Sequence, residues 1–165
     1  LVSRSDSDRI LSKHIFESLL LLSHLGPDVA RLADIGTGGG FPGIPLALAR
    51  SDTQVSLIES ARMKTLFLKE AVGSLSLTNV EVLYDRAERV AETRKGTFDI
   101  ATSRAVAGLD RVWELAEPLL KSQGVLLSLK GPGEAEADLG PLGIEFKEHH
   151  IRTDDRTVAI VVVRK

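Results

Sequence analysis

The stretch that decides the fold is Asp34-Ile35-Gly36-Thr37-Gly38-Gly39-Gly40, which reads D-x-G-x-G-x-G at the end of an apolar run. The run from Arg31 to Ile35 predicts a β-strand, and the glycines allow a sharp turn and a close approach to a ligand. A helix is expected after Pro42, up to about Arg50, because proline is favoured near the start of a helix. In an open α/β sheet such a loop lies at the carboxyl end of its strand, where ligands bind.

The same alternation of strand and helix continues along the chain, and it predicts a parallel α/β sheet. Residues 8–25 open the chain with a helical pattern that Gly26-Pro27 ends. Further strands are expected over 55–58, 80–84, 98–102 and 124–129, and helical segments over 61–74, 87–93, 109–120 and 134–139. The last two strands, 144–150 and 157–163, have no helix between them and should pair antiparallel.

We therefore expect an α/β fold with a mostly parallel seven-stranded sheet, a C-terminal antiparallel hairpin and helices on both faces. This arrangement resembles the Rossmann-like sheet of Class I methyltransferases, which use S-adenosylmethionine (AdoMet). It differs from the six-stranded, all-parallel dinucleotide fold. The apolar side of the 61–74 helix, together with Tyr84 and Trp113, is expected to pack in the core; the alternative for Tyr84 is a position that flanks the adenine of a bound cofactor.

Composition bounds the function. The chain has 165 residues, 43% hydrophobic and 27% charged, with a net charge of −2, as in an ordinary globular domain. The two signs are evenly spread, unlike those of a protein that coats nucleic acid nonspecifically. The absence of cysteine excludes disulfides, cysteine metal sites and a cysteine nucleophile. No signal peptide or membrane-spanning run is visible, so we expect a cytoplasmic protein.

Several polar groups near the glycine loop suit AdoMet. Asp34, at the end of the first strand, suits the ammonium of the methionine moiety. Glu59 ends the second strand, where a carboxylate accepts hydrogen bonds from both ribose hydroxyls; the alternative is a solvated carboxylate. Ala87-Glu88 follows the third strand, where a backbone amide and a carboxylate meet an adenine edge, although Glu88 also suits the amino end of a helix.

Nicotinamide binding is the competing interpretation of the loop. Gly38, Gly40 and Gly43 match G-x-G-x-x-G, and Glu59 lies at a suitable distance for a ribose. A lone match of this kind is weak evidence. The aspartate before the first glycine and the terminal hairpin favour AdoMet.

Three longer stretches carry a closer resemblance. Residues 34–46, Ser103-Arg104-Ala105 and Leu129-Lys130-Gly131 resemble the RsmG family, also called glucose-inhibited division protein B. The similarity runs from about residue 13 to the last strand, and its most specific part is Phe41-Pro42-Gly43-Ile44-Pro45. Members of that family methylate N7 of a guanine in bacterial small-subunit (16S) ribosomal RNA.

The resemblance implies a set of site residues. It implies cofactor contacts at Gly36, Phe41, Glu59, Ala87, Glu88 and Arg104, and the glycine loop itself adds Asp34, Gly38 and Gly40 as expected contacts. Arg104 and Lys130 are the catalytic candidates: Arg104 would contact the cofactor or the base, and Lys130 a phosphate or guanine O6. Both, together with His14, are candidate RNA contacts. The alternatives are solvated cations at strand ends and, for His14, a surface or core histidine.

The expected reaction fits these residues. N7 of guanine already carries a lone pair, so no general base is needed and orientation is the protein's task. The end of the fourth strand reads Thr102-Ser103-Arg104-Ala105, not the Asn/Asp-Pro-Pro-aromatic motif of exocyclic amine methylation. Alternatives are methylation of another RNA or a small molecule, and a noncatalytic AdoMet-binding module associated with the ribosome.

The domain and partner predictions follow. Residues 1–26 are expected to form an N-terminal helical segment, shortened relative to the family, and residues 27–165 the AdoMet-binding domain. The expected partner is small-subunit rRNA or the small ribosomal subunit, with the chain as a monomer. No membrane association is expected. No metal is expected either, since His149 and His150 alternate in direction along a strand and cannot both face one ion.

Overall fold

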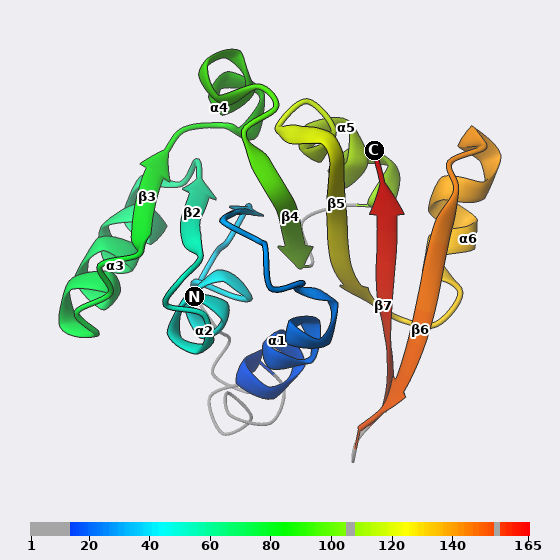
Figure 1. The fold of residues 1–165 in the computed structure, drawn as a ribbon, viewed down its shortest axis with the longest axis horizontal. Helices are drawn as coiled ribbons and strands as arrows, with labels where there is room; N and C mark the ends of the chain where they lie inside the picture. Colours follow the sequence, from blue (N-terminus) through cyan, green and yellow to red (C-terminus); the bar gives the residue numbers. More distant parts are fainter. Residues whose placement is uncertain (1–13, 105–107, 154–155) are drawn as a thin grey trace.

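A computed structural model describes residues 14–104, 108–153 and 156–165. Seven strands form one sheet in the order β3-β2-β1-β4-β5-β7-β6 (Figure 1). The pairs among the first five strands are parallel, and β7 runs antiparallel to both β5 and β6. The expected mixed sheet with a terminal hairpin is confirmed.

The elements lie close to their expected positions. The strands are β1 (Arg31–Ile35), β2 (Gln54–Glu59), β3 (Val80–Tyr84), β4 (Phe98–Arg104), β5 (Leu120–Lys130), β6 (Phe146–Arg152) and β7 (Thr157–Arg164). The helices are α1 (Glu17–Leu20), the 3-10 helix η3 (Leu21–His24), α2 (Gly43–Ala49), α3 (Arg62–Ser74), α4 (Ala87–Arg94), α5 (Leu109–Ala116), α6 (Glu134–Leu139) and the 3-10 helix η4 (Gly140–Leu142).

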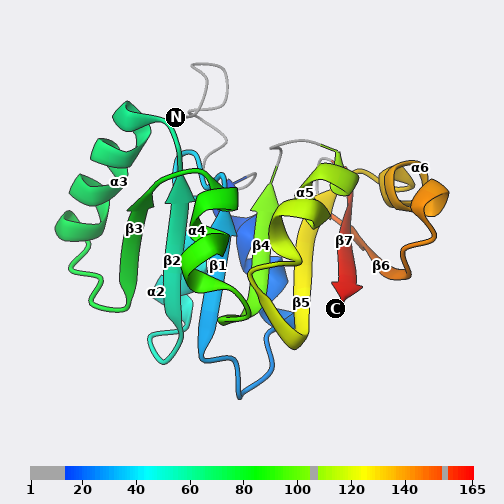
Figure 2. The same ribbon diagram turned by 90° about the horizontal axis from the view of Figure 1, so that it is seen from above.

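Helices cover both faces of the sheet, so the core has two halves (Figure 2). On one face the sheet packs against η3, α2 and α3, through Leu21, Leu46 and Leu68 among others. On the other face it packs against α4, α5 and α6, through Val90, Leu109 and Leu139. Because β1, β2 and β4 are covered on both faces, they are buried along most of their length, as strands of a parallel sheet are.

The fifth helical segment is shorter than the sequence predicts. The 109–120 pattern ends at Ala116, and β5 begins at Leu120 instead of residue 124. Pro118 has no amide hydrogen to continue the hydrogen bonds of a helix, although Glu117 before it still has helical backbone. Leu119 and Leu120 are fully buried, so the apolar residues assigned to the helix end pack into the core at the start of β5.

The segment before β1 packs on the same core as the rest of the chain. Of the 8–25 pattern, residues 8–13 lie outside the described ranges. Leu21 is completely buried and Leu25 nearly so. The buried Glu17 carboxylate accepts two hydrogen bonds from Nη2 of Arg156, at 2.9 and 3.0 Å, which tie α1 to the start of β7. None of the helices in the described ranges is long and apolar enough to cross a membrane.

The apolar side of α3 is where the core prediction is wrong. Leu68 is fully buried, but Met63, Leu66 and Phe67 are 76%, 50% and 39% exposed. Tyr84, also expected in the core, is 56% exposed. The reason is position: β3 is the edge strand and α3 lies beside it, so no further element covers this side (Figure 1). Trp113 is half-buried and packs against the core as expected.

Candidate functional site

The loop after β1 is built around glycines that hold left-handed backbone. Gly36, Gly38 and Gly40 have φ of 63°, 61° and 92°, a region that side chains with a Cβ rarely occupy. A Cβ at Gly40 would overlap the side chain of Ile44 on α2. The Thr37 amide donates to the carbonyl of Ile58, at 3.2 Å, which fixes the loop against the end of β2.

Asp34 lies beneath this loop and is completely buried. Its Oδ2 accepts hydrogen bonds from the Thr37 hydroxyl (2.5 Å) and the Gly43 amide (2.9 Å). Its Oδ1 accepts one from the Thr102 hydroxyl (3.1 Å), across from β4. The carboxylate therefore joins the loop, the start of α2 and β4, and a direct bond to a ligand ammonium would have to compete with these donors.

Burial makes Asp34 an unusual acid. Desolvation raises the pKa of its carboxyl from 3.8 to about 6, although the hydrogen bonds from Thr37, Gly43 and Thr102 and the charge of Arg104 act in the opposite direction. The group is still mostly ionised at neutral pH. A charge at this depth is tolerated because three donors surround it.

Glu59, at the end of β2, is the nearly buried carboxylate of the site, with 6% of its surface exposed. Its Oε2 accepts the amide of Gly38 at 3.0 Å, and its Oε1 accepts the amide of Ala61 at 2.8 Å. The ammonium of Lys64 lies 4.0 Å from Oε2. Each carboxylate oxygen has more than one lone pair, so both can also accept a hydroxyl. The structure thus places two acceptor oxygens beside the loop, and their contact with ribose hydroxyls stays a prediction.

A pocket of about 170 Å³, here called the Gly36 pocket, opens between the loop and α4. Its lining consists of Ile35, Gly36, Ile58, Ser60, Asp85, Arg86, Ala87, Glu88 and Leu115. Three predicted cofactor residues, Gly36, Ala87 and Glu88, thus meet in one pocket. The carboxylate of Glu88 also forms an ion pair with Arg111 on α5. Apolar walls with polar groups at the rim suit a flat heterocycle.

Phe41 sits between two of the predicted RNA contacts. The centroid of its ring lies 5.4 Å from the His14 ring and 5.2 Å from Cζ of Arg104, whose guanidinium lies over the ring. This is a cation–π contact. His14 is only 8% exposed, so in this structure it packs against the loop, and contact with RNA would require that packing to open.

Arg104 and Lys130 end adjacent strands but start from different faces of the sheet. Arg104 is level with Leu129, so Lys130 lies one residue farther along β5. Because side chains alternate along a strand, Arg104 leaves the sheet on the α2 side and Lys130 on the α5 side. The structure thus places Arg104 beside the loop, on Phe41. It separates Lys130 from that stack.

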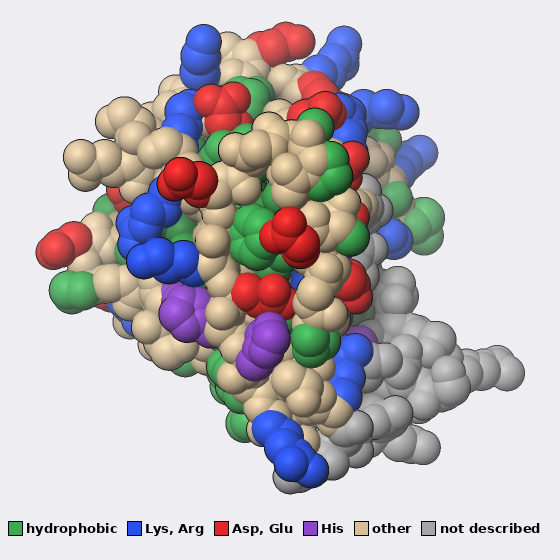
Figure 3. All heavy atoms as spheres, turned by 90° about the vertical axis from the view of Figure 1, so that its right-hand side faces the viewer, with side chains coloured by type: hydrophobic (Ala, Val, Ile, Leu, Met, Phe, Trp, Pro, Cys, Tyr) green, Lys and Arg blue, Asp and Glu red, His purple; other side chains and the backbone are tan. Residues whose placement is uncertain are grey.

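The histidines of β6 point in opposite directions, as the alternation predicts. His149 meets the His24 ring edge-on at 4.8 Å, and Nε2 of His150 lies 3.2 Å from a Glu148 oxygen. Figure 3 shows this side of the molecule, where acidic and basic side chains are mixed. The described part of the chain holds no group of three or more His, Asp or Glu side chains arranged to bind a metal ion.

Two groups of residues were missed from sequence. Thr37 and Thr102 supply the hydroxyls that hold Asp34, and Ser60 and Asp85 line the Gly36 pocket. A signal existed for Thr102, because it ends the strand predicted over 98–102; in the structure that strand continues to Arg104 and places Thr102 level with Asp34. Nothing in the local sequence distinguishes Ser60 or Asp85 from ordinary loop residues.

The raised pKa of Asp34 predicts an inverted pH dependence of stability. The folded state binds this proton more tightly than the unfolded state, so the group contributes stability below pH 3.8 that is lost as pH rises through about 6. Asp34→Asn keeps the shape and removes the titration. Relative to this variant, wild-type unfolding free energy should fall by roughly 2–3 kcal/mol from pH 4 to pH 7, measured by urea unfolding. The exposed Asp28→Asn serves as control, and parallel curves for wild type and Asp34→Asn would contradict the assignment.

Comparison with solved structures shows the fold. The chain is similar to a SAM-dependent methyltransferase from Aquifex aeolicus, with a TM-score of 0.72 and 18% identity over 96% of this chain and 94% of that one. It is also similar to TYW2 of M. jannaschii, solved in complex with AdoMet, with a TM-score of 0.66 and 17% identity over 93% of this chain and 78% of that one. These likenesses establish a Class I methyltransferase fold.

Comparison with sequences shows the family. Three relatives are named ribosomal RNA small subunit methyltransferase G. That of Moorella thermoacetica is 38% identical over 88% of this chain and 62% of its own length. That of Desulfitobacterium hafniense is 39% identical over 100% of this chain and 73% of its own length. That of Sorangium cellulosum is 42% identical over 84% of this chain and 59% of its own length. The chain thus spans less than two thirds of two of these relatives. Residues 1–142 match the family GidB, described as rRNA small subunit methyltransferase G, and the chain therefore belongs to this family.

Proposed function

We propose that this chain transfers a methyl group from AdoMet to N7 of a guanine in bacterial 16S rRNA. The observation that carries the proposal, in a chain of this family, is the position of Arg104 over Phe41. Phe41 directly follows the glycine loop, which the Glu59 carboxylate fixes. A cationic group thus stands next to the loop that would hold the methyl donor. We place the reaction in the bacterial cytoplasm, with small-subunit rRNA as the partner and the chain as a monomer.

The residues present fit AdoMet. Gly36 and Gly38 have no side chain, so the ligand can approach their backbone closely, and the carboxylate oxygens of Glu59 can accept hydrogen bonds from a ribose diol. Ala87 and Glu88 close the Gly36 pocket, which is of a shape that suits the adenine. When bound there, AdoMet supplies a methyl group on a cationic sulfur. Asp34 acts below the loop and holds its conformation through Thr37 and Gly43.

The acceptor chemistry asks little of the protein beyond orientation. Guanine N7 has a free lone pair, so no base has to remove a proton before transfer. The chain has no cysteine, which excludes the nucleophile that methylation of a pyrimidine carbon requires. Alignment of donor and acceptor contributes roughly 7–11 kcal/mol in well-oriented reactions. A rigid loop with a buried carboxylate beneath it provides that kind of support.

Arg104 is the residue best placed to orient the base. A guanidinium commonly reads guanine through O6 and N7. Since N7 is the reacting atom here, Arg104 would donate to O6 and leave N7 to face the donor. The cation–π contact with Phe41 holds the guanidinium in place. Lys130, on the other face of the sheet, is assigned to a phosphate.

The direct test is methyl transfer from labelled AdoMet to small ribosomal subunits from cells that lack this modification. We expect N7-methylguanosine at one site, identified after nuclease digestion. Label on another nucleoside would overturn the guanine assignment. AdoMet binding without transfer to the subunit or to its naked rRNA would overturn the proposed activity and favour a noncatalytic module.

Glu59→Ala should weaken AdoMet binding about tenfold to a hundredfold, because hydrogen bonds to a charged acceptor contribute about 1.5–3 kcal/mol. The substitution removes both ribose acceptors and the bond that fixes Gly38. Calorimetric titration with AdoMet measures the effect. Glu59→Asp keeps a carboxylate and should lose less affinity. Unchanged affinity in Glu59→Ala would remove this residue from the site.

Arg104→Ala should lower methyl transfer by about a hundredfold, which is the typical cost of misplacing a reacting group. Turnover should fall more than AdoMet affinity, because the base loses its orienting donor. Arg164→Ala is the matched control. Arg164 is exposed and lies level with Val125 in β5, at the end of the strands opposite to Arg104. Wild-type turnover in Arg104→Ala would contradict the assigned role.

A further inference from the structure

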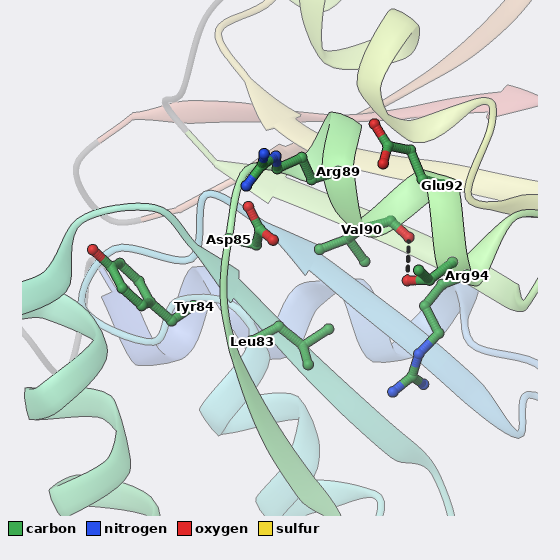
Figure 4. A pocket seen from close by; sticks show the side chains of 8 residues that line it. Leu83, Tyr84, Asp85, Arg89, Val90, Glu92 and Arg94 are labelled. Carbon is green, nitrogen blue, oxygen red and sulfur yellow. Dashed lines mark hydrogen bonds between the residues drawn. The ribbon is translucent and has the colours of Figure 1, made fainter.

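A second pocket adjoins the Gly36 pocket on the α4 side. It has a volume of about 360 Å³ and is lined by Ser60, Tyr84, Asp85, Arg86 and Arg89; we call it the Arg89 pocket. It shares Ser60, Asp85 and Arg86 with the Gly36 pocket. On its other side it continues into a cleft of about 420 Å³ between β3 and α4 (Figure 4). A hollow surface thus leads away from the cofactor site along α4.

The arginines of this pocket are not neutralised by ion pairs. Within the described residues, no carboxylate lies within ion-pair distance of the Arg86 or Arg89 guanidinium, whereas Arg94, at the other end of α4, pairs with Glu81 at 3.3 Å. Both Arg86 and Arg89 are exposed. A guanidinium at a pocket rim presents several donors to a phosphate.

An aromatic ring and a carboxylate complete the lining. Tyr84 is 56% exposed and borders α3, whose uncovered residue Met63 is 76% exposed. Figure 4 shows Tyr84 directed away from α4 and Arg89 extending from α4, with Asp85 between them. One oxygen of Asp85 accepts the amide of Arg86 at 2.8 Å, which holds the carboxylate at the pocket. Such a carboxylate accepts a ribose 2′-hydroxyl, a group that RNA has and DNA lacks.

We propose that the Arg89 pocket binds one nucleotide of the acceptor RNA outside the target guanine. Its phosphate would lie on Arg86 and Arg89, its base on the Tyr84 ring, and its 2′-hydroxyl at Asp85. The inference rests on the proposed function and adds an RNA subsite to it. Stacking on an exposed aromatic residue combined with phosphate contacts is the usual way in which proteins hold single-stranded nucleic acid.

The charge balance of the surface favours RNA over a protein partner. Asp85 and Glu92 are the acidic groups that face this region, and Asp85 has a role in the subsite. Glu88 and Glu81 are occupied by Arg111 and Arg94. Among the described residues, the positive groups of this region without an ion pair therefore lie next to the Gly36 pocket, and the acidic Glu92 lies farther along the cleft.

The test uses Arg89 and Tyr84, which lie outside the Gly36 pocket. Binding of the 165-residue chain to an in vitro transcript of small-subunit rRNA is measured over a series of salt concentrations. Arg89→Ala should raise the Kd about tenfold and reduce the salt slope by roughly 0.7, the value for one phosphate contact on a single strand. Tyr84→Ala should raise the Kd by five-fold or more through lost stacking, with an unchanged slope. Tyr84→Phe should bind like wild type.

Arg94→Ala is the matched control, since it removes the same charge from the same helix where Glu81 already pairs with it. AdoMet affinity, measured by calorimetry, should stay at the wild-type value in Arg89→Ala and Tyr84→Ala. DNA of the same sequence should compete only weakly with the rRNA for binding to wild type. It should compete more effectively for binding to Asp85→Ala. Kd values in Arg89→Ala and Tyr84→Ala equal to that of Arg94→Ala would overturn the proposal.

Two further outcomes separate this proposal from the proposed function. If wild type methylates the rRNA but the Arg89 and Tyr84 variants bind it normally, the subsite is wrong and the activity stands. If the variants lose affinity for rRNA while wild type transfers no methyl group, the subsite stands and the activity is wrong. A loss of affinity for the assembled subunit, with normal affinity for the naked transcript, would assign the surface to a ribosomal protein and overturn the RNA subsite.

Discussion

The buried carboxylate of Asp34 is the interaction on which the rest of the site depends. Three donors from three separate segments converge on it: the Thr37 hydroxyl, the Gly43 amide and the Thr102 hydroxyl. A charge at this depth is stable only when its donors are present together, so the carboxylate fixes these three segments relative to one another.

The contacts of Asp34 fix the conformation of the loop as far as Phe41, on which Arg104 lies. With Thr37 and Gly43 held, Gly38 and Gly40 take left-handed backbone, and the Gly38 amide donates to Glu59. Phe41 then emerges beneath the guanidinium of Arg104. The group proposed to bind the donor and the group proposed to orient the acceptor are thus positioned by one loop. A change at Asp34 would be felt at both, although Asp34 itself faces neither.

Much of the fold follows from the sequence because the signals are strong and local. Strands β1, β2 and β4 are nearly continuous buried runs, and a strand followed by a glycine turn has few alternatives. The Pro118 boundary was missed because the apolar residues beyond it continue the helical spacing into β5. Periodicity shows that residues share a side, but it does not show whether anything covers that side.

The edge of the sheet illustrates the limit. Met63 and Tyr84 carry the pattern of core residues, and they are exposed because β3 has no neighbour beyond it. For the site, sequence predicted Glu59 and the loop, since these follow from strand ends. It did not predict that His14 would pack on Phe41 or that Lys130 would leave the sheet opposite Arg104. Both features depend on strand register and on tertiary contacts, which the local spacing of residues in the sequence does not show.

The distribution of ion pairs shows how a chain of net charge −2 is compatible with the proposed RNA subsite. Many cations are paired within the protein: Arg50 with Asp52, Arg94 with Glu81, Arg111 with Glu88 and Glu114, Lys121 with Asp99, and Arg156 with Glu17. Paired charges add little to the field at a distance. The cations that attract a phosphate are therefore set by which carboxylates lie near them, not by their number. Within the described ranges Arg86 and Arg89 form no ion pair, so the attraction expected for a phosphate is local to the Arg89 pocket, and in the proposed function specificity depends on the contacts of the loop and Arg104.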